Sequence, residues 1–166
     1  RKIKTRNGAS YVAIRAWRRA IKQHQMTALK AIKKDSVENL ARLAGPECAR
    51  EIDRLVGAQT FKFIVPVPCG HSRAGKCLSA ALARAIGVEL GLPVIIAFSH
   101  LEQKGSSHPK KNVGRPSMKL VQRVPGPALL IDDVATSGDH IAEAINLLKA
   151  AGTETFALAW ISGERD

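Results

Sequence analysis

The chain has 166 residues, of which 45% are hydrophobic and 24% are charged. This length suits one domain with its own core, and the composition is typical of globular proteins, which excludes a disordered, collagen-like or fibrous chain. No apolar run approaches the roughly 18 to 20 residues that span a bilayer, so a membrane-spanning protein is excluded as well.

The net charge of +12, from 26 basic and 14 acidic residues, is concentrated near the N-terminus. Residues 1–34 contain 11 basic residues and no acidic residue. Two interpretations stay open: this region binds a polyanion such as RNA, DNA or an acidic lipid surface, or its charges lie on a solvated helix face. The absence of interleaved aromatic residues and of a groove-reading motif favours the solvated face.

Cysteine usage and the first residues bear on the cellular compartment. The chain has three cysteines, Cys48, Cys69 and Cys77, which cannot all pair with one another and whose spacing does not suggest a zinc site. The N-terminal residues show no apolar segment followed by a small-residue cleavage site. We therefore expect reduced thiols and a cytoplasmic protein with no membrane partner.

The first third of the chain is expected to be helical. Apolar residues recur at helical spacing over residues 10–32, which predicts an amphipathic helix. A capping box predicts a second helix over 35–43, and the Gly-Pro pair at 45–46 separates it from a third helix over 46–57. Residues 1–57 would then form a helical, basic N-terminal region.

Strands and helices alternate in the rest of the chain. We expect strands at 61–68, 93–99, 120–124, 127–132 and 155–162, helices at 76–91 and 141–152, and a long polar loop at 99–119. This alternation predicts an α/β core over residues 58–166, with a mostly parallel sheet and helices on both faces.

The chemistry concentrates in the segment ALLIDDVATSGDHI at residues 128–141. A buried strand ends in Asp132 and Asp133, whose carboxylates can accept hydrogen bonds from sugar hydroxyls at the carboxyl edge of a sheet. The turn at 136–138 places backbone N–H groups and two hydroxyls at a helix N-terminus, which suits a phosphate. A diol next to a phosphate suggests a ribose 5-phosphate, and the alternative is that the two acids only cap a helix.

The string LLIDDVATSG resembles the phosphoribosyl pyrophosphate (PRPP) signature of the type I phosphoribosyltransferases. The order of strands, loops and helices over roughly residues 60–162 is also similar to this family. It looks most like the branch related to the ComF competence proteins, through PVPCGHSRAGKCLSAALARAIG and KKNVG.

The resemblance implies roles for the acids and for the turn. Asp132 and Asp133 would act in catalysis by binding the ribose hydroxyls of PRPP, directly or through Mg²⁺. The residues that would wrap the 5-phosphate are Thr136, Ser137, Gly138, Asp139 and His140.

Two further loops receive roles from the same resemblance. The loop at 70–76 would approach the pyrophosphate through Arg73, Ala74, Gly75 and Lys76. The long polar loop would close as a lid that brings the cations Lys110, Lys111 and Arg115 to the leaving group. Residues 103–131 contain six basic residues and no acidic residue, and cations of this kind stabilise the charge that develops on a leaving pyrophosphate.

The phosphate turn departs from the family pattern at two positions. The residue after Gly138 is usually small and the next is usually Thr or Ser, whereas this chain has Asp139 and His140. A carboxylate repels a phosphate, while a protonated imidazole replaces a hydroxyl by a charge-assisted donor. Thr136 stands where members that use hypoxanthine carry an acid, which argues against hypoxanthine as the acceptor.

The resemblance implies a phosphoribosyltransferase that binds Mg²⁺ and PRPP, transfers the phosphoribosyl group to an unidentified nitrogenous acceptor and releases pyrophosphate. A second hypothesis is a non-catalytic protein of the same fold that associates with nucleic acid through residues 1–34. A third is a phosphosugar hydrolase or transferase that does not use PRPP. The like-charged N-terminal region disfavours packing of two copies along it, and a homodimer through other faces stays open.

Overall fold

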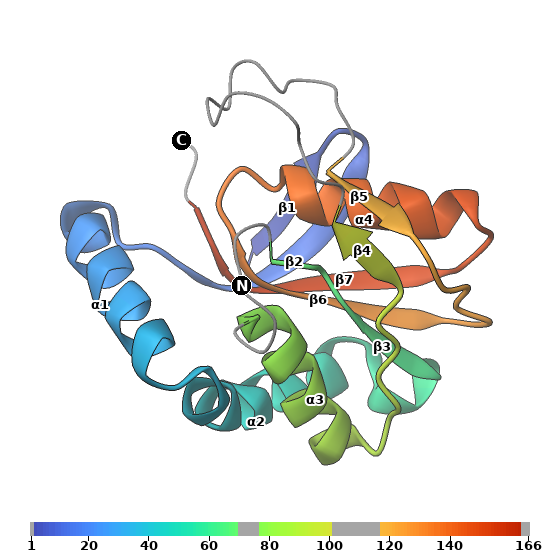
Figure 1. The fold of residues 1–166 in the computed structure, drawn as a ribbon, viewed down its shortest axis with the longest axis horizontal. Coiled ribbons are helices and arrows are strands. Elements are labelled where there is room, and N and C mark those ends of the chain that lie inside the picture. Colours follow the sequence, from blue (N-terminus) through green and yellow to red (C-terminus); the bar gives the residue numbers. More distant parts are fainter. Residues whose placement is uncertain (1, 70–76, 101–116, 164–166) are drawn as a thin grey trace.

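The computed structural model describes residues 2–69, 77–100 and 117–163. Its centre is a five-stranded sheet with the order β1-β2-β7-β6-β3 (Figure 1). The strands are β1 (Lys2–Arg6), β2 (Ala9–Ala16), β3 (Phe63–Pro66), β6 (Ala128–Ala135) and β7 (Thr155–Ser162). All neighbours pair in parallel except β1, which is antiparallel to β2. The expected mostly parallel α/β sheet is confirmed.

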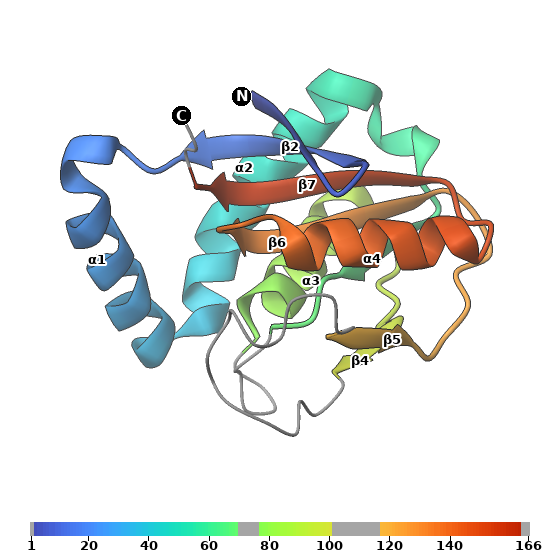
Figure 2. The same cartoon turned by 90° about the horizontal axis from the view of Figure 1, so that it is seen from above.

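Helices cover both faces of this sheet (Figure 2). On one face, α2 (Val37–Val56) and α3 (Leu78–Leu90) pack against Ile64, Leu129 and Leu158. The other face is covered by α4 (Asp139–Ala150) and by a two-stranded ribbon of β4 (Phe98–His100) and β5 (Met118–Leu120). Short 3-10 turns occupy Arg19–Ile21 and Ala58–Thr60.

Strand β6 is the most buried element of the sheet. Residues 128–131 are fully buried, with apolar side chains alternating between the two cores. Because each buried Leu or Ile side chain contributes about 1.5 to 3 kcal/mol, this run fixes the register of β6 between β3 and β7. The buried register in turn determines where the two acids that follow Ile131 lie.

Several predicted elements match the structure closely. Strand β7 covers the predicted residues 155–162, and α4 ends before Gly152 as expected. Helix α3 ends at Gly91, whose φ of 66° gives the left-handed cap that a glycine provides most readily. These segments are predictable because the periodicity of each strand or helix agrees with the residues that end it.

The predicted helix over residues 10–32 is wrong in its first half. Residues 2–16 form the β1–β2 hairpin, and α1 (Lys22–Asp35) begins only at Lys22. Asn7 and Gly8 form the hairpin turn with φ values of 49° and 75°, which is the backbone that an Asn-Gly pair favours. Every second residue from Ala9 to Ala13 is buried, which is a strand pattern. The N-terminal residues are therefore helical only after the hairpin.

The predicted break at residues 45–46 is also wrong, since α2 is continuous from Val37 to Val56. Ser36 caps it by accepting a hydrogen bond from the N–H of Asn39. A Cβ on Gly45 would lie 2.7 Å from the Cβ of Ala85 in α3. Gly45 thus serves close packing between two helices instead of ending one.

The strands next to the long loop lie away from their predicted positions. The segment at 93–99 follows the outer side of β3 through a bridge between Ile64 and Val94, and only its end enters β4. The strand predicted at 120–124 is the shorter β5, which ends at Leu120. Both predicted strands were placed on apolar runs that form no continuous ladder, and Ile96 and Val121 within them are exposed.

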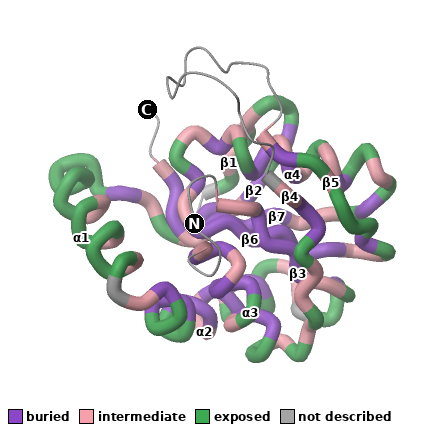
Figure 3. The backbone as a smooth tube through the Cα atoms, in the orientation of Figure 1, coloured by how far each residue is buried: buried purple, intermediate pink, exposed green. Residues whose placement is uncertain are grey.

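Helix α1 stands apart from the two cores. Most of its residues are exposed, and Figure 3 shows it as the least buried helix beside the buried sheet. It follows β2 after the 3-10 turn at Arg19–Ile21, and it lies beyond the carboxyl ends of the parallel strands (Figure 2). In the described part of the chain, no helix combines the length and apolar character that crossing a bilayer requires.

Candidate functional site

The sheet reverses its winding direction between β3 and β6. After β3 the chain runs through α3 to Val94, which lies on the outer side of β3. After β6 it runs through α4 to β7, on the opposite side. In open α/β sheets, ligands bind beyond the carboxyl ends of the strands at such a reversal. The carboxyl ends of β3 and β6 are therefore the place to look for a site.

Asp132 and Asp133 lie in β6 near this edge. Both are buried, with 7% and 6% of their surface exposed, and successive residues of a strand point to opposite faces. Burial, followed by the negative charge of Asp133, raises the pKa of Asp132 well above its usual value. The pair therefore combines a carboxyl that tends to keep its proton with a second acid next to it.

A lysine from the N-terminal helix contacts this pair. The ammonium group of Lys33 in α1 donates to Oδ2 of Asp133 in an ion pair that leaves 31% of the Lys33 side chain and 9% of the Asp133 side chain exposed. In the sequence alone, Lys33 is one of the 11 basic residues of the N-terminal region. No local signal marks this contact, because it joins residues that are 100 positions apart.

The turn after β6 leads directly into the N-terminus of α4. Thr136 is exposed, Ser137 is half-buried, and Gly138 adopts a φ of 77° at the start of α4. The hydroxyl of Ser137 accepts a hydrogen bond from the N–H of Asp139 at 3.3 Å. A Cβ on Gly138 would lie 2.8 Å from the hydroxyl oxygen of Tyr11, so the turn packs closely against the N-terminal hairpin. Only glycine fits both the backbone and this contact.

Asp139, the unusual acid of the turn, is engaged by the hairpin. Its Oδ1 accepts from Nε of Arg6 at 2.6 Å and from Nδ2 of Asn7 at 3.3 Å. The Arg6 guanidinium holds the pKa of Asp139 below its usual value. The negative charge that would repel a phosphate is therefore compensated, while His140 next to it is exposed.

The structure thus brings together the two acids, the turn at 136–140, Lys33 and Arg6. The hairpin that positions Arg6 was missed, although its Asn-Gly signal is present in the sequence. The remaining predicted site residues lie outside the described residues: Arg73, Ala74, Gly75, Lys76, Lys110, Lys111 and Arg115.

The acid pair suits a Mg²⁺ ion that is bound together with a phosphate ligand. Among the described residues, no group of three or more His, Cys, Asp or Glu side chains is arranged to hold a metal ion. Mg²⁺ often takes one or two protein carboxylates, with phosphate oxygens and water completing its shell. Asp132 and Asp133 fit this role, because a bound cation would favour the charged form of Asp132 against the burial and the charge of Asp133 that raise its pKa.

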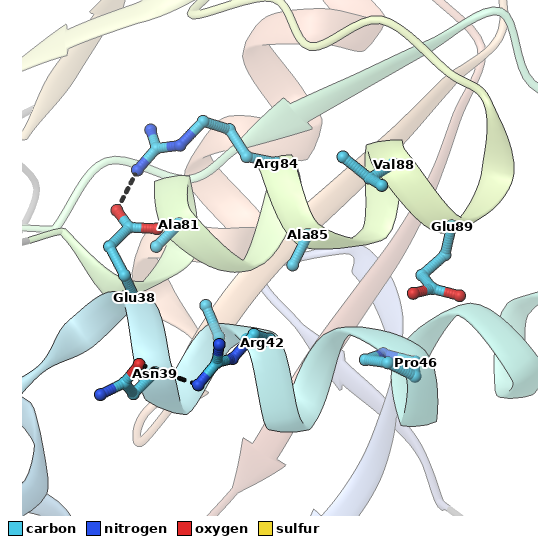
Figure 4. A pocket seen from close by; sticks show the side chains of 10 residues that line it. Glu38, Asn39, Arg42, Pro46, Ala81, Arg84, Ala85, Val88 and Glu89 are labelled. Atoms are coloured by element: carbon cyan, nitrogen blue, oxygen red, sulfur yellow. Dashed lines mark hydrogen bonds and ion pairs between the residues drawn. The ribbon is translucent and has the colours of Figure 1, made fainter.

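A groove on the molecule lies elsewhere. It runs between α2 and α3 and is lined by residues such as Arg42, Pro46 and Val88 (Figure 4). Arg84 reaches across it to Glu38 in an ion pair of 2.6 Å. None of the lining residues belongs to the predicted site, so the groove adds nothing to the acid pair and its turn.

The similarity of the chain to known proteins is found in structure. No family model matches the chain. No curated protein matches it. Among the solved structures that match, the chain is similar to the orotate phosphoribosyltransferase from Aeropyrum pernix, with a TM-score of 0.47 and 20% identity. The match covers 75% of this chain and 58% of that enzyme, so the chain spans less than two thirds of its length.

Proposed function

We propose that this chain is a phosphoribosyltransferase that binds PRPP with Mg²⁺ at the carboxyl ends of β3 and β6 and transfers the phosphoribosyl group to a nitrogenous acceptor. The observation that carries the proposal is the sequence of two buried acids, a glycine turn and a helix N-terminus at the reversal of the sheet. Within the phosphoribosyltransferases, the segment PVPCGHSRAGK favours the branch related to the ComF proteins.

The acid pair is assigned to the ribose. A carboxylate has room for about four hydrogen bonds, so Asp133 can keep Lys33 on Oδ2 and still accept a ribose hydroxyl. Asp132, once a bound cation favours its charged form, can accept a hydrogen bond from the second hydroxyl. Lys33 is a positioning residue in this scheme, because it holds Asp133 and lowers the negative potential around the pair.

The turn is assigned to the 5-phosphate. The backbone N–H groups at the start of α4 and the hydroxyls of Thr136 and Ser137 supply donors, as helix N-termini do for anions. Because Asp139 is bound by Arg6, its carboxylate does not oppose the phosphate with a full unpaired charge. The hairpin therefore contributes to the site by neutralising the turn.

The proposed reaction is a displacement at the anomeric carbon. A nitrogen lone pair of the acceptor forms the new C–N bond, and the C–O bond to pyrophosphate breaks with its electron pair leaving on pyrophosphate. Mg²⁺, held by Asp132, Asp133 and phosphate oxygens, would neutralise the charge of the leaving group. The chain's own residues hold the ribose and phosphate in position, which is where much of such catalysis arises.

Calorimetric titration of PRPP tests the proposal, with and without Mg²⁺. The wild-type chain should bind only with Mg²⁺, and Asp132→Asn and Asp133→Asn should each weaken binding about tenfold or more, since charged hydrogen bonds are lost. Glu154→Gln is the control, because Glu154 is an exposed acid that precedes β7 at the opposite edge of the sheet. Wild-type affinity in both Asn variants, with the fold verified by circular dichroism, would overturn the assignment.

A second candidate function rests on the charged surface of α1 and the turn before it. Arg18, Arg19, Lys22, Lys30 and Lys34 are all exposed there. Such a surface can bind nucleic acid through phosphates, with affinity that falls steeply with salt. Deleting residues 1–34 is a poor test, because it would remove β2 from the sheet.

Charge neutralisation tests this candidate without disturbing the sheet. The triple variant Lys22→Gln, Lys30→Gln and Lys34→Gln should lower the affinity for a fluorescent DNA or RNA duplex and flatten its salt dependence. Lys149→Gln in α4 is the exposed control. Binding that is insensitive to salt, or equal in the triple and control variants, would contradict a nucleic-acid role of α1.

A further inference from the structure

Two cysteines meet at the start of α3, next to the acid pair. Cys69 follows β3 and Cys77 is the N-cap residue of α3, and their Sγ atoms are 2.6 Å apart. The backbone that leads to Cys69 is held against β6, because the N–H of Val67 donates to the carbonyl oxygen of Ile131 at 2.8 Å. The two sulfurs are therefore brought together by the sheet edge and by a helix N-terminus.

A buried serine supports this pair. Ser79 is fully buried and donates its hydroxyl to the carbonyl oxygen of Val67. The hydroxyl oxygen of Ser79 lies 3.1 Å from Sγ of Cys77 and 3.5 Å from Sγ of Cys69. Both thiols are half-buried, which leaves them accessible to a small reagent. The arrangement holds two thiols in contact around one fixed polar atom.

The two thiols differ in acidity. The hydrogen bond with Cys69, and then that from the backbone N–H of Ala80, lower the pKa of Cys77 to about 5 despite its burial. The hydrogen bond to Cys77 and burial raise the pKa of Cys69. A thiolate next to a protonated thiol is the asymmetry that thiol–disulfide exchange uses.

Cys48 provides a contrast within the same chain. It is fully buried in the core between α2 and the sheet, where burial raises its pKa to about 12. A buried thiol with a raised pKa is inert towards oxidants. Of the three free cysteines, only Cys69 and Cys77 combine access with a partner.

We propose that Cys69 and Cys77 form a redox modification site, in which a low-molecular-weight disulfide converts the two thiols into an intramolecular disulfide. The thiolate of Cys77 attacks one sulfur of the small disulfide and releases one thiolate. Cys69 then loses its proton and attacks the sulfur of Cys77, which releases the second thiolate. Two protein thiols are oxidised and one small disulfide is reduced to two thiols.

The consequence is a covalent link between the end of β3 and the start of α3. A short loop closed in this way restricts the unfolded chain, so the urea midpoint of unfolding should rise on oxidation. The proposal does not depend on the phosphoribosyltransferase assignment, because its product is a bond that is detected directly.

Oxidised glutathione is the probe, and intact mass with peptide mapping is the readout. The wild-type chain and Cys48→Ser should lose two hydrogen atoms in mass and yield a linked Cys69–Cys77 peptide pair, reversibly with dithiothreitol. Cys69→Ser should stop at a glutathione adduct on Cys77, and Cys77→Ser should react much more slowly. Because the wild-type measurement needs no variant to fold, it stands on its own.

The outcomes that overturn the proposal are equally direct. One is a wild-type chain that keeps three free thiols in excess oxidised glutathione. The other is a chain that accumulates glutathione adducts on Cys69 and Cys77 without the internal bond. Equal reaction rates of Cys48 and Cys77 would also contradict it, because Cys48 is buried with a raised pKa, whereas Cys77 is half-buried with a lowered pKa.

Discussion

Lys33 on α1 and Asp133 on β6 form an ion pair at the carboxyl edge of the sheet. The pair joins the most exposed helix to the most buried strand, across 100 positions of sequence. Asp133 is almost fully buried beside a second acid, so the ammonium group of Lys33 supplies the positive charge that such a site needs. The N-terminal basic region is thus linked to the candidate site by a specific contact.

Replacing Lys33 by Met should destabilise the fold. The substitution keeps much of the side-chain volume but leaves Asp133 buried without its cation, and we expect a loss of about 1 to 3 kcal/mol, reduced because Lys33 is partly exposed. Urea unfolding near neutral pH measures it. Lys34→Met, at the exposed neighbouring position, is the control and should change stability by less than about 0.5 kcal/mol. Equal losses in both variants would contradict a specific role of Lys33.

Replacing Asp132 by Asn should stabilise the fold in a pH-dependent manner. The pKa of Asp132 is higher in the folded than in the unfolded chain, so the wild-type fold loses stability as the pH rises from its unfolded value towards the raised pKa. Each unit of difference is worth about 1.4 kcal/mol. The Asp132→Asn variant has no carboxyl to titrate at this position and does not lose this stability. Its free energy of unfolding should therefore exceed that of the wild type by an amount that grows with pH.

Thermal unfolding from about pH 4 to pH 8 measures this advantage, with Glu154→Gln as the exposed control. The difference in unfolding temperature between Asp132→Asn and the wild type should be smallest at the lowest pH. A difference that is constant over this range, or a variant less stable than the wild type at pH 8, would contradict the raised pKa.

The parts of the site that the sequence could predict are contiguous in the chain. The apolar run before Asp132, the two acids, Gly138 and the apolar face of α4 follow one another, so local patterns agree and locate strand, turn and helix together. The same consistency explains why β7 and α3 were placed correctly.

The parts that could not be predicted depend on distant pairing. Residues 9–16 fit a helical and a strand period, and pairing of β2 with β7 decides between them. The contacts of Lys33 with Asp133 and of Arg6 with Asp139 join residues 100 and 133 positions apart. Nothing in the local sequence marks such pairs, although the Asn-Gly turn could have placed Arg6 on a hairpin.

Removing the cation from the Arg6–Asp139 pair should weaken PRPP binding. In Arg6→Gln the carboxylate of Asp139 is no longer neutralised beside the phosphate turn, and we expect affinity to fall about two- to fivefold. The double variant Arg6→Gln, Asp139→Asn removes both charges and should recover most of this loss. Because the loss of Arg6 returns the pKa of Asp139 only towards its usual acidic range, the carboxylate stays charged near neutral pH with and without Arg6.

Arg15→Gln is the matched control for the Arg6 and Asp139 variants. It breaks the ion pair of Arg15 in β2 with Glu47 in α2, in which Nη2 lies 2.7 Å from Oε1, without touching the turn. PRPP titration should give wild-type affinity for this control. If the double variant binds no better than Arg6→Gln, neutralisation of Asp139 is not how the hairpin acts on the turn.

Replacing Gly45 by Ala should loosen the contact between α2 and α3. The added Cβ would lie 2.7 Å from the Cβ of Ala85, which is closer than two carbon atoms approach, so the helices must separate. Overpacking of this kind costs about 1 to 3 kcal/mol, whereas alanine gains roughly 1 kcal/mol in helix propensity. We expect a net loss of about 1 kcal/mol in urea unfolding. The exchanged variant Gly45→Ala, Ala85→Gly restores the space and keeps one glycine and one alanine, so it should return to near wild-type stability. A single Gly45→Ala variant as stable as the wild type would show that α2 and α3 do not pack at this distance in solution.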